Sequence, residues 1–218
     1  MSDLLSEVDE AMRQDRAMEI WNKYGNIFIG ALITLILATA VYSGYKHWST
    51  SRAKENTGAL LLALAEKEPV APLLAYADEN DGIYEAIARQ NAGHYLTESG
   101  APEKALEQFK RVESQESIDK TFTDYAALNA IYLKIKTEQV RDPDLEFLKT
   151  LMESKTSPWR FHARVAAAII TGDVNGDPAE AARILAPLTR EGAQMPESLK
   201  RRAASLHHIY SILGTDSQ

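Results

Sequence analysis

The stretch YGNIFIGALITLILATAVYSGY, from Tyr24 to Tyr45, contains 22 residues and no charged side chain. Each helical residue adds about 1.5 Å, so a helix of this length is roughly 33 Å long and exceeds the hydrocarbon core of a bilayer, which is about 30 Å thick. The length and composition of this stretch therefore predict one transmembrane helix over residues 24–45.

Aromatic and basic residues stand at both ends of the predicted span. Tryptophan and tyrosine rings favour the headgroup level of a bilayer, and a lysine closes each end with a charge. We therefore predict six membrane-interface anchors, which are Trp21, Lys23, Tyr24, Tyr45, Lys46 and Trp48.

Two other interpretations of residues 24–45 are weaker. A buried helix of a soluble domain seldom stays uncharged around its whole circumference, because its outer face meets water. The triplet Ala38-Thr39-Ala40 resembles a signal-peptide cleavage site, but the residues before the span hold six acids against three bases, which is a poor signal-peptide leader. The orientation stays open, since three bases precede the span and three follow it within the relevant distance.

The rest of the chain predicts one globular helical domain with an acidic balance. Residues 46–218 are long enough for a domain of common size with its own core. The formal net charge is -7, of which -3 belongs to residues 1–23. This balance speaks against nucleic acid as a partner, since such binding calls for a basic face. The absence of cysteine excludes disulfides, thiolate metal ligands and cysteine nucleophiles.

Five prolines mark the expected helix starts of this domain. Proline fixes φ and lacks an amide hydrogen, which costs nothing in the first turn of a helix. Asp142, Ser157 and Asp177 precede three of these prolines as N-cap candidates. No segment alternates with a period of two for long enough to predict a strand. The five are Pro102, Pro143, Pro158, Pro178 and Pro196.

A weak repeat follows two of these prolines. Pro102 and Pro178 each have alanine three residues later and a large apolar residue seven residues later. Pro143 has Glu146 at the alanine position, so the middle copy is degenerate. Tetratricopeptide repeats, of about 34 residues, place a small residue where two helices cross. The residues predicted to pack within the repeats are Tyr84, Gly93, Gly100, Ala105, Phe109, Trp159, Ala181 and Leu185.

The predicted fold class is all-α, with a single transmembrane helix followed by a tetratricopeptide repeat-like α-solenoid of helix pairs. We expect helix pairs at 83–115, 121–153 and 158–190, and a closing helix at 197–213. An irregular helical bundle is the alternative, because three imperfect copies are the minimum for this pattern. The predicted divisions are an acidic amphipathic tail (1–23), the span (24–45), juxtamembrane and packing helices (46–81), the repeat domain (82–213) and a disordered tail (214–218).

The sequence offers no catalytic, metal-binding or cofactor-binding constellation. Residues 173–177 begin like a calcium loop, but Pro178 and Ile184 stand where that loop needs glycine and glutamate, so we expect a turn between helices. The five histidines lack metal-ligand spacing, and the common nucleophile, phosphate-loop and zinc-protease motifs are missing from the sequence. We therefore predict that the protein is not an enzyme and uses no cofactor.

The aromatic residues of the domain fall mostly at helical spacing. Core packing is their default role, with one or two of them exposed in a groove as anchors for a partner. The sequence does not single out the exposed ones. The candidates are Tyr84, Tyr95, Phe109, Phe122, Tyr125, Tyr132, Phe147, Trp159, Phe161 and Tyr210.

Taken in order, these elements resemble the YfgM-like family of ancillary subunits of the SecYEG translocon. The resemblance implies an N-terminus in the cytoplasm and a tetratricopeptide-like domain in the periplasm of a bacterium. It also implies contacts with the translocon and with periplasmic chaperones. The residues that carry it are Glu7-Val8-Asp9-Glu10, Trp21-Asn22-Lys23-Tyr24-Gly25, Tyr45-Lys46-His47-Trp48, Glu79-Asn80-Asp81-Gly82-Ile83-Tyr84-Glu85-Ala86 and Trp159.

We therefore expect a single-pass inner-membrane protein that acts as a non-catalytic scaffold and links the translocon to periplasmic folding factors. An envelope-assembly or cell-division scaffold of the same architecture is the first alternative, since only its clients would differ. A membrane-bound hydrolase or metal protein is the alternative from another class. Loss of function on replacing a single polar residue, with folding intact, would favour that second class.

Overall fold

The computed structural model describes the backbone of residues 2–190 and 195–216. In helix α1 it describes only two side chains before residue 34, those of Met18 and Tyr24. All regular structure in these ranges is helical, which confirms the predicted all-α class. The chain divides into two compact units, Met1–Asn56 and Thr57–Gln218.

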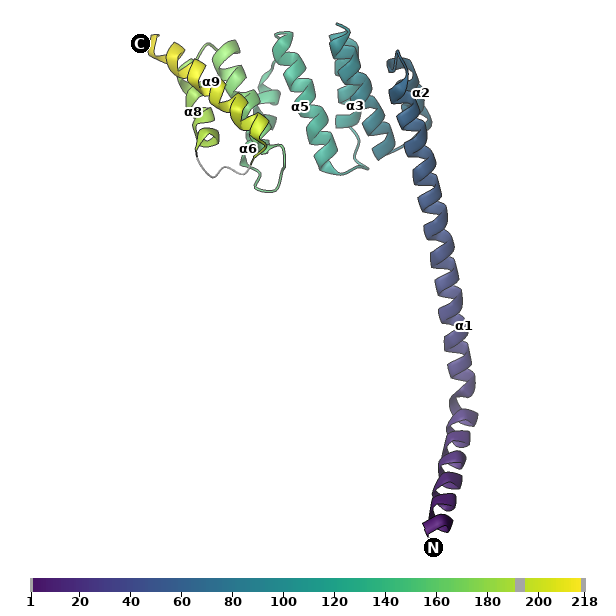
Figure 1. Cartoon of the computed structure of the whole chain (residues 1–218). Helices are drawn as coiled ribbons and strands as arrows, with labels where there is room; N and C mark the ends of the chain where they lie inside the picture. Colours follow the sequence, from purple (N-terminus) through teal and green to yellow (C-terminus); the bar gives the residue numbers. More distant parts are fainter. Residues whose placement is uncertain (1, 191–194, 217–218) are drawn as a thin grey trace. The chain divides into compact units, whose positions relative to one another are not determined.

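Nine α-helices and one π-turn follow one another along the described residues (Figure 1). Helices α2 to α9 belong wholly to the second unit, as do the last residues of α1. The elements are α1 (Ser2–Ala65), α2 (Val70–Glu79), α3 (Ile83–Glu98), α4 (Pro102–Glu113), α5 (Lys120–Lys136), α6 (Asp142–Glu153), α7 (Arg160–Ile169), the π-turn η1 (Ile170–Val174), α8 (Pro178–Thr189) and α9 (Glu197–Asp216).

Helix α1 contains the stretch that the sequence predicts to span a membrane. Within the part of the chain whose side chains the structure describes, no helix is both long and apolar enough to cross a bilayer. Residues 25–33 of the predicted span lie outside that part, as do the predicted anchors Trp21 and Lys23. The transmembrane helix therefore stays a prediction.

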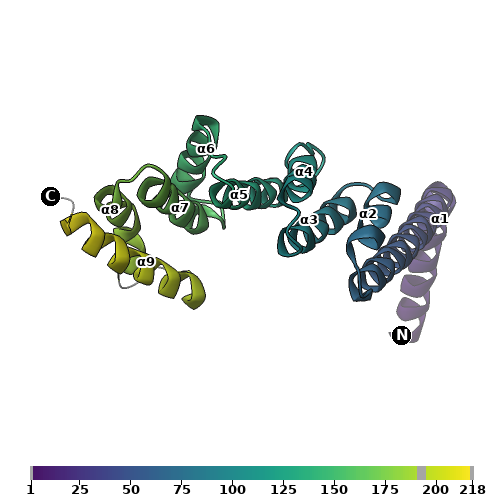
Figure 2. The same cartoon turned by 90° about the horizontal axis from the view of Figure 1, so that it is seen from above.

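Helices α2 to α9 pack largely in sequence order. Close packing joins α2 to α3, α3 to α4 and α4 to α5, and then α6 to α7, α7 to α8 and α8 to α9. Seen from above, α4 and α6 lie on one side of this array, whereas α3 and α5 lie on the other side (Figure 2). The expected ranges contain α3 with α4, α5 with α6 and α7 with α8, and the closing helix corresponds to α9. Helices α5 and α6 are not among the closely packed neighbours, since α6 packs on α7 instead.

Proline begins the second helix of each pair. Pro102 is the first residue of α4, Pro178 is the first residue of α8, and Pro143 is the second residue of α6. The amide groups at these positions have no partner inside the helix, so proline gives up no hydrogen bond there. The structure therefore confirms the helix starts that the prolines predict at these three places.

Carboxylates cap two of these helices, and one of them is not the residue expected. Asp177 caps α8 as predicted, because its Oδ1 accepts a hydrogen bond from the Glu180 amide at 2.8 Å. The N-cap expected at Asp142 is wrong, since this residue is already the first of α6. Asp144 satisfies a donor at this end of α6 instead, by accepting from the Arg141 amide at 2.9 Å. A carboxylate inside the first turn also suits the positive end of the helix dipole.

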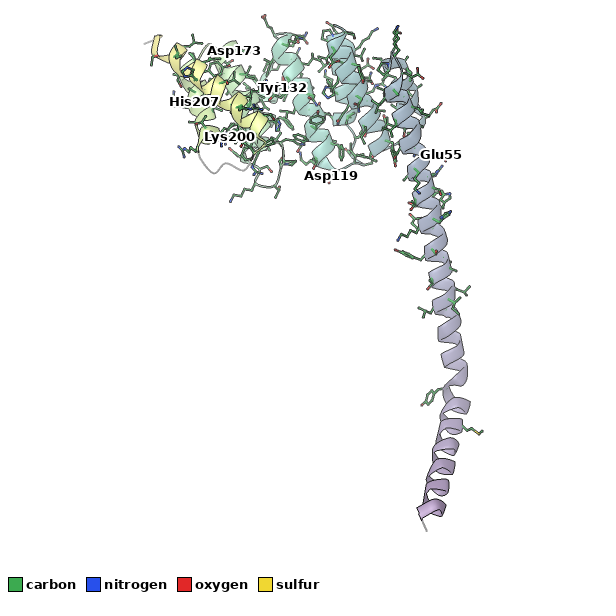
Figure 3. All side chains as sticks on the ribbon, in the orientation of Figure 1. Glu55, Asp119, Tyr132, Asp173, Lys200 and His207 are labelled. Carbon is green, nitrogen blue, oxygen red and sulfur yellow. The ribbon has the colours of Figure 1, made fainter. Side chains whose placement is uncertain are left out.

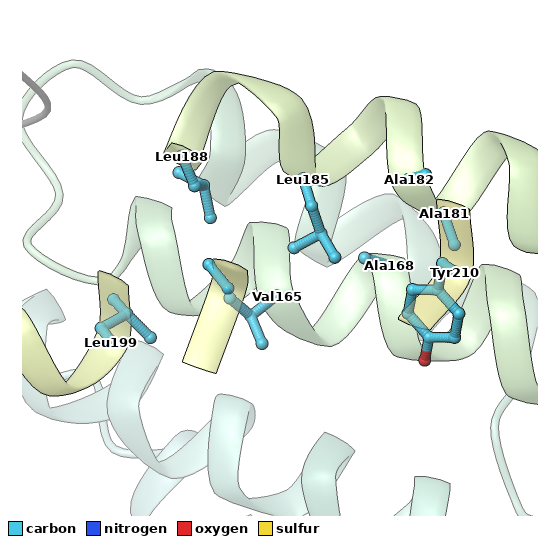
Figure 4. Packing of buried hydrophobic residues seen from close by; sticks show 9 residues of the cluster. Val165, Ala168, Ala181, Ala182, Leu185, Leu188, Leu199 and Tyr210 are labelled. Carbon is cyan, nitrogen blue, oxygen red and sulfur yellow. The ribbon is translucent and has the colours of Figure 1, made fainter. Parts of the chain in front are cut away.

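Apolar side chains join consecutive helices in local clusters. The cluster at the C-terminal end connects α7, α8 and α9 (Figure 4). Val165 and Leu185 are fully buried in it, and Tyr210 of α9 closes one end. Full burial of one such aliphatic side chain contributes about 1.5–3 kcal/mol. This cluster therefore fixes the closing helix to the last helix pair.

Two contacts between a glycine and an aromatic ring set the distance between helices. An atom at the Cβ position of Gly93 on α3 would lie 2.6 Å from Cε1 of Phe109 on α4. The same position on Gly172 of the π-turn lies 2.6 Å from Cε1 of Tyr210 on α9. Real side-chain atoms do not approach so closely, so only glycine lets these rings pack directly on the neighbouring backbone.

The middle pair departs from this close packing. Helices α4 and α8 bury the alanine that follows their proline by three residues, Ala105 and Ala181. Helix α6 has the exposed Glu146 at this position and buries Leu148 and Leu151 instead. A cleft of about 550 Å³ lies between α4, α5 and α6. A second cleft, of about 430 Å³, lies along the same α5–α6 junction.

We predict that Gly93→Ala destabilises the second unit. The added methyl group would overlap the Phe109 ring, and overpacking of this kind typically lowers the free energy of unfolding by about 1–3 kcal/mol. Gly58→Ala is the matched control, because no atom lies within 4 Å of the Cβ position of this helical glycine. Urea titration of both full-length variants, followed by circular dichroism, measures the difference. A Gly93 variant as stable as the control would contradict the packing described.

Candidate functional site

A row of ring contacts crosses helices α3, α5 and α7. The His94 ring lies 6.2 Å from the Tyr125 ring. The Tyr125 ring in turn stacks on the Trp159 ring at 4.7 Å, and the Trp159 ring meets the His162 ring edge to face at 5.5 Å. All four side chains are partly exposed. These four residues, together with Tyr132, are called the aromatic row below.

Hydrogen bonds to the backbone fix two rings of the aromatic row. The indole Nε1–H of Trp159 donates to the Thr121 carbonyl at 2.8 Å, which ties the start of α7 to the start of α5. The Tyr132 hydroxyl donates to the His162 carbonyl at 3.1 Å, which ties the same two helices further along. Rings held in this way lose little freedom when a partner binds, which favours affinity.

Residue spacing places the aromatic row on one side of its helices. Tyr125 and Tyr132 are seven residues apart on α5, so they lie on the same face. Trp159 and His162 are three residues apart at the start of α7, where the same rule applies. Figure 3 shows Tyr132 on α5, between that helix and α9. The side chains thus lie along one side of the alternate helices α3, α5 and α7, and two of them, Tyr132 and Trp159, also pack against the buried cluster of α5, α6 and α7.

Both histidines of the aromatic row have a lowered pKa. Burial lowers the pKa of His94, and the negative charge of Glu98 opposes this only in part. The His94 Nε2 lies 3.3 Å from the Tyr125 hydroxyl. Burial also lowers the pKa of His162, and the positive charge of Arg202 lowers it further. Because the ordinary pKa of histidine is about 6.5, both rings are neutral near pH 7.

A cation borders the aromatic row where α9 approaches α5. The guanidinium carbon of Arg202 lies 5.4 Å from the centroid of the Tyr132 ring, which is the geometry of a cation–π contact. Burial raises the pKa of Tyr132, with Arg202 acting in the opposite direction. The row is therefore an uncharged aromatic strip with a positive charge at one end.

The carboxylates of residues 173–177, which begin like a calcium loop in the sequence, make structural contacts. No group of three or more metal-ligating side chains gathers in the part of the chain that the structure describes. The carboxylate of Asp173 accepts a hydrogen bond from the Tyr210 hydroxyl at 2.9 Å, and that of Asp177 caps α8. Residues 173 and 174 thus end η1, and the expected turn between helices is confined to residues 175–177.

The predicted membrane-interface anchors lie on α1. Tyr24, Tyr45 and Trp48 are 44%, 66% and 56% exposed, and Lys46 is exposed as well. The Tyr45 and Trp48 rings lie 6.3 Å apart, and the Arg52 guanidinium lies 5.0 Å from the Trp48 ring centroid. Aromatic rings and a cation thus gather on the C-terminal side of the predicted span.

Five of the predicted packing residues lie at helix crossings. Gly93 meets Phe109 between α3 and α4, and Ala105 is fully buried in the same cluster. Ala181 and Leu185 are fully buried between α7, α8 and α9. The small and large positions of the repeat pattern thus occupy corresponding places in the first and third pairs.

The other three predicted packing residues have different surroundings. Tyr84 packs at the edge of the cluster formed by the end of α1 with α2 and α3. Gly100 lies in the turn between α3 and α4 with a φ of 78°, where the missing side chain serves the turn and not a contact. Trp159 packs partly on the α5–α7 cluster and belongs to the aromatic row.

Part of the aromatic row could be predicted from the sequence. The seven-residue spacing of Tyr125 and Tyr132, and the three-residue spacing of Trp159 and His162, are signals of shared faces. The contact of Arg202 with Tyr132 has no such signal, because it joins α9 to α5 across the tertiary fold. Sequence reasoning therefore missed the cation that borders the row.

Comparisons of the chain with protein-family models, with curated proteins and with solved structures gave no significant match. A function is therefore inferred from the fold and from the chemistry of the aromatic row.

We predict that acidification weakens the second unit through His94 and His162. Their folded-state pKa values lie below that of unfolded histidine, so their contribution to stability is present above about pH 6.5 and is lost as the pH falls through the folded values. When the pH is lowered from about 7.5 to 5.5, the melting temperature of the double variant His94→Gln, His162→Gln should therefore fall less than that of the unmodified protein.

The exposed His208→Gln is the control, and it should keep the pH dependence of the unmodified protein. Thermal melts followed by circular dichroism at both pH values measure the two slopes. If the melting temperature changes equally with pH in the double variant and in the unmodified protein, protonation of these two rings does not affect stability.

Proposed function

We propose that this protein is a membrane-anchored, non-catalytic scaffold that binds other proteins at a bacterial inner membrane. The aromatic row is the observation that carries the proposal. Rigid aromatic side chains dominate the energetics of protein interfaces, because they bury a large area at a low cost in conformational entropy. Five such side chains on the alternate helices α3, α5 and α7 offer one elongated surface to a partner.

The anchor of this scaffold is residues 24–45 of α1. All described side chains from Thr34 to Tyr45 are exposed, among them Leu35 (64%), Leu37 (61%) and Val41 (72%). Exposed apolar surface costs about 25 cal/mol per Å² in water, so a helix that is apolar all round is stabilised by hydrocarbon surroundings. The uncharged run of 22 residues supplies the length for one crossing.

The binding domain is proposed to be a tetratricopeptide repeat-like solenoid. Support comes from the crossing residues, because Ala105 with Phe109 and Ala181 with Leu185 are buried at the small and large positions of that pattern. In this interpretation α3–α4 and α7–α8 are well-formed repeats, α5–α6 is a degenerate repeat, and α9 closes the array. Repeats that stack in this way present long surfaces to their partners.

The proposed partners are the SecYEG translocon and periplasmic folding factors. The resemblance to the YfgM-like family, carried by Trp21-Asn22-Lys23-Tyr24-Gly25 and Tyr45-Lys46-His47-Trp48, supports this choice. It also supports a cytoplasmic N-terminus and a periplasmic second unit. Tethering beside the translocon would hold a folding factor at an effective concentration of about a millimolar, without any strong single contact.

We predict that the C-terminus lies in the periplasm. A reporter active only in the periplasm, fused after Gln218, should give a signal on a product that keeps residues 1–45, whereas a reporter active only in the cytoplasm should stay silent. Gel mobility of the fusion checks that the N-terminal segment remains attached. A signal from the cytoplasmic reporter and none from the periplasmic one would indicate a membrane-tethered adaptor in the cytosol. It would exclude periplasmic chaperones as partners.

We further predict that the aromatic row lies within reach of the partners in intact membranes. A photo-reactive phenylalanine analogue in place of Tyr125 should crosslink translocon subunits or periplasmic chaperones, identified by mass spectrometry. The same analogue in place of Lys149, exposed on α6, is the control and should capture much less. Equal capture at both positions, or capture of neither class of protein, would count against the proposed function.

A further inference from the structure

Three consecutive cations lie near the start of the closing helix, after Glu197, Ser198 and Leu199. Lys200, Arg201 and Arg202 lie in the first half of α9, and none of them forms an ion pair with the side chains that the structure describes. Some cations elsewhere in the array are paired with carboxylates. Arg89 of α3 pairs with Asp78 and Glu85, at 2.8 and 2.6 Å, and is buried. The α9 cations thus leave their charge available to a ligand.

The sign of the charge changes along the second unit. Acids outnumber bases nineteen to thirteen from residue 46 to 154, whereas bases outnumber acids eight to six from residue 155 to 218. The described acids of this last part are partly engaged, since Asp173 binds Tyr210, and Asp177 caps α8. The α7–α9 end of the array is therefore the positive end of an otherwise acidic protein.

Only one of the three cations borders the aromatic row. Successive residues of a helix point about 100° apart, so the three side chains leave α9 in different directions. Arg202 lies over the Tyr132 ring, and its charge reaches His162 strongly enough to lower the pKa of that ring.

We propose that the aromatic row and Arg202 together bind an acidic, extended segment of a partner protein. The inference rests on the proposed protein-binding function and names the chemistry of its partner. Apolar side chains of the segment would lie on the Tyr125, Tyr132 and Trp159 rings, and a carboxylate would pair with the Arg202 guanidinium, which suits bidentate contact. Complementary charge at the end of an apolar strip also fixes the direction in which the segment lies.

A protein segment fits these observations better than an anionic lipid surface. A lipid surface attracts every exposed cation of α9 to a similar degree, so Arg201 would matter as much as Arg202. A segment lying along the aromatic row contacts Arg202 alone, since only this cation borders the Tyr132 ring. The difference between these two arginines therefore separates the two partners.

The test uses the full-length protein in detergent and three fluorescent peptides, (Glu-Gly-Leu)4, (Gln-Gly-Leu)4 and (Lys-Gly-Leu)4. Fluorescence anisotropy measures their dissociation constants. The glutamate peptide should bind about tenfold more tightly than the glutamine peptide, the lysine peptide should bind least, and added salt should weaken the preference. Arg202→Glu should weaken binding of the glutamate peptide about tenfold, and Arg202→Lys less.

Arg201→Glu and Lys149→Glu are the matched controls, since both side chains are exposed on helices of the same unit. Each should change the affinity less than about threefold, with unchanged thermal melts. Equal binding of the glutamate and glutamine peptides, or no binding up to about 1 mM, would overturn the proposal. Equal effects of the Arg201 and Arg202 reversals, together with binding to phosphatidylglycerol vesicles, would assign the site to lipid.

Crosslinking from position 125 separates failure of this inference from failure of the proposed function. If the Tyr125 position captures a partner in membranes and Arg202→Glu leaves that capture unchanged, the scaffold function stands and the acidic partner is rejected. If the position captures no protein and the peptides do not bind, both proposals fail. Capture that Arg202→Glu abolishes and Arg201→Glu preserves supports both.

Discussion

Burial of each helix against the next is the constraint on which the second unit depends. Helices α2 to α9 are 10 to 20 residues long, and helices of this length are marginal in water without tertiary contacts. The Gly93–Phe109 contact shows how close the approach is, because a ring lies where any other residue would have its Cβ. The aromatic row depends on this spacing, since its rings come from three different helices.

The sequence predicted the positions of the helices better than their contacts. Proline, alanine and glycine are local signals of helix starts and close crossings, and Pro102, Ala105 and Gly93 lie where that chemistry requires. Contacts between distant helices have no comparable signal. Neither the stacking of Tyr125 on Trp159 nor the approach of Arg202 to Tyr132 follows from spacing alone, because each depends on how the array curves.

Arginine residues have different surroundings at the two ends of the array. At the α2–α4 end, Arg89 is buried and its guanidinium binds Glu85, Asp78 and Gln108, so this cation holds three helices together. At the α9 end, Arg202 is exposed and bound to no carboxylate of the described residues. The same residue type is a structural element in one place and the means of contact with a ligand in the other.

The array deforms most easily at the junction between α5 and α6. Leu148 and Leu151 are buried in the cluster that α6 shares with α5 and α7, and Phe147 lines both clefts along the junction. Phe147 is partly exposed beside these clefts, whereas the Phe109 ring, packed on the backbone of Gly93, has no room to shift. A pulling force along the array would therefore be taken up first between α5 and α6, while α3 and α4 move together. A change in the curvature of the array would be concentrated at the same junction.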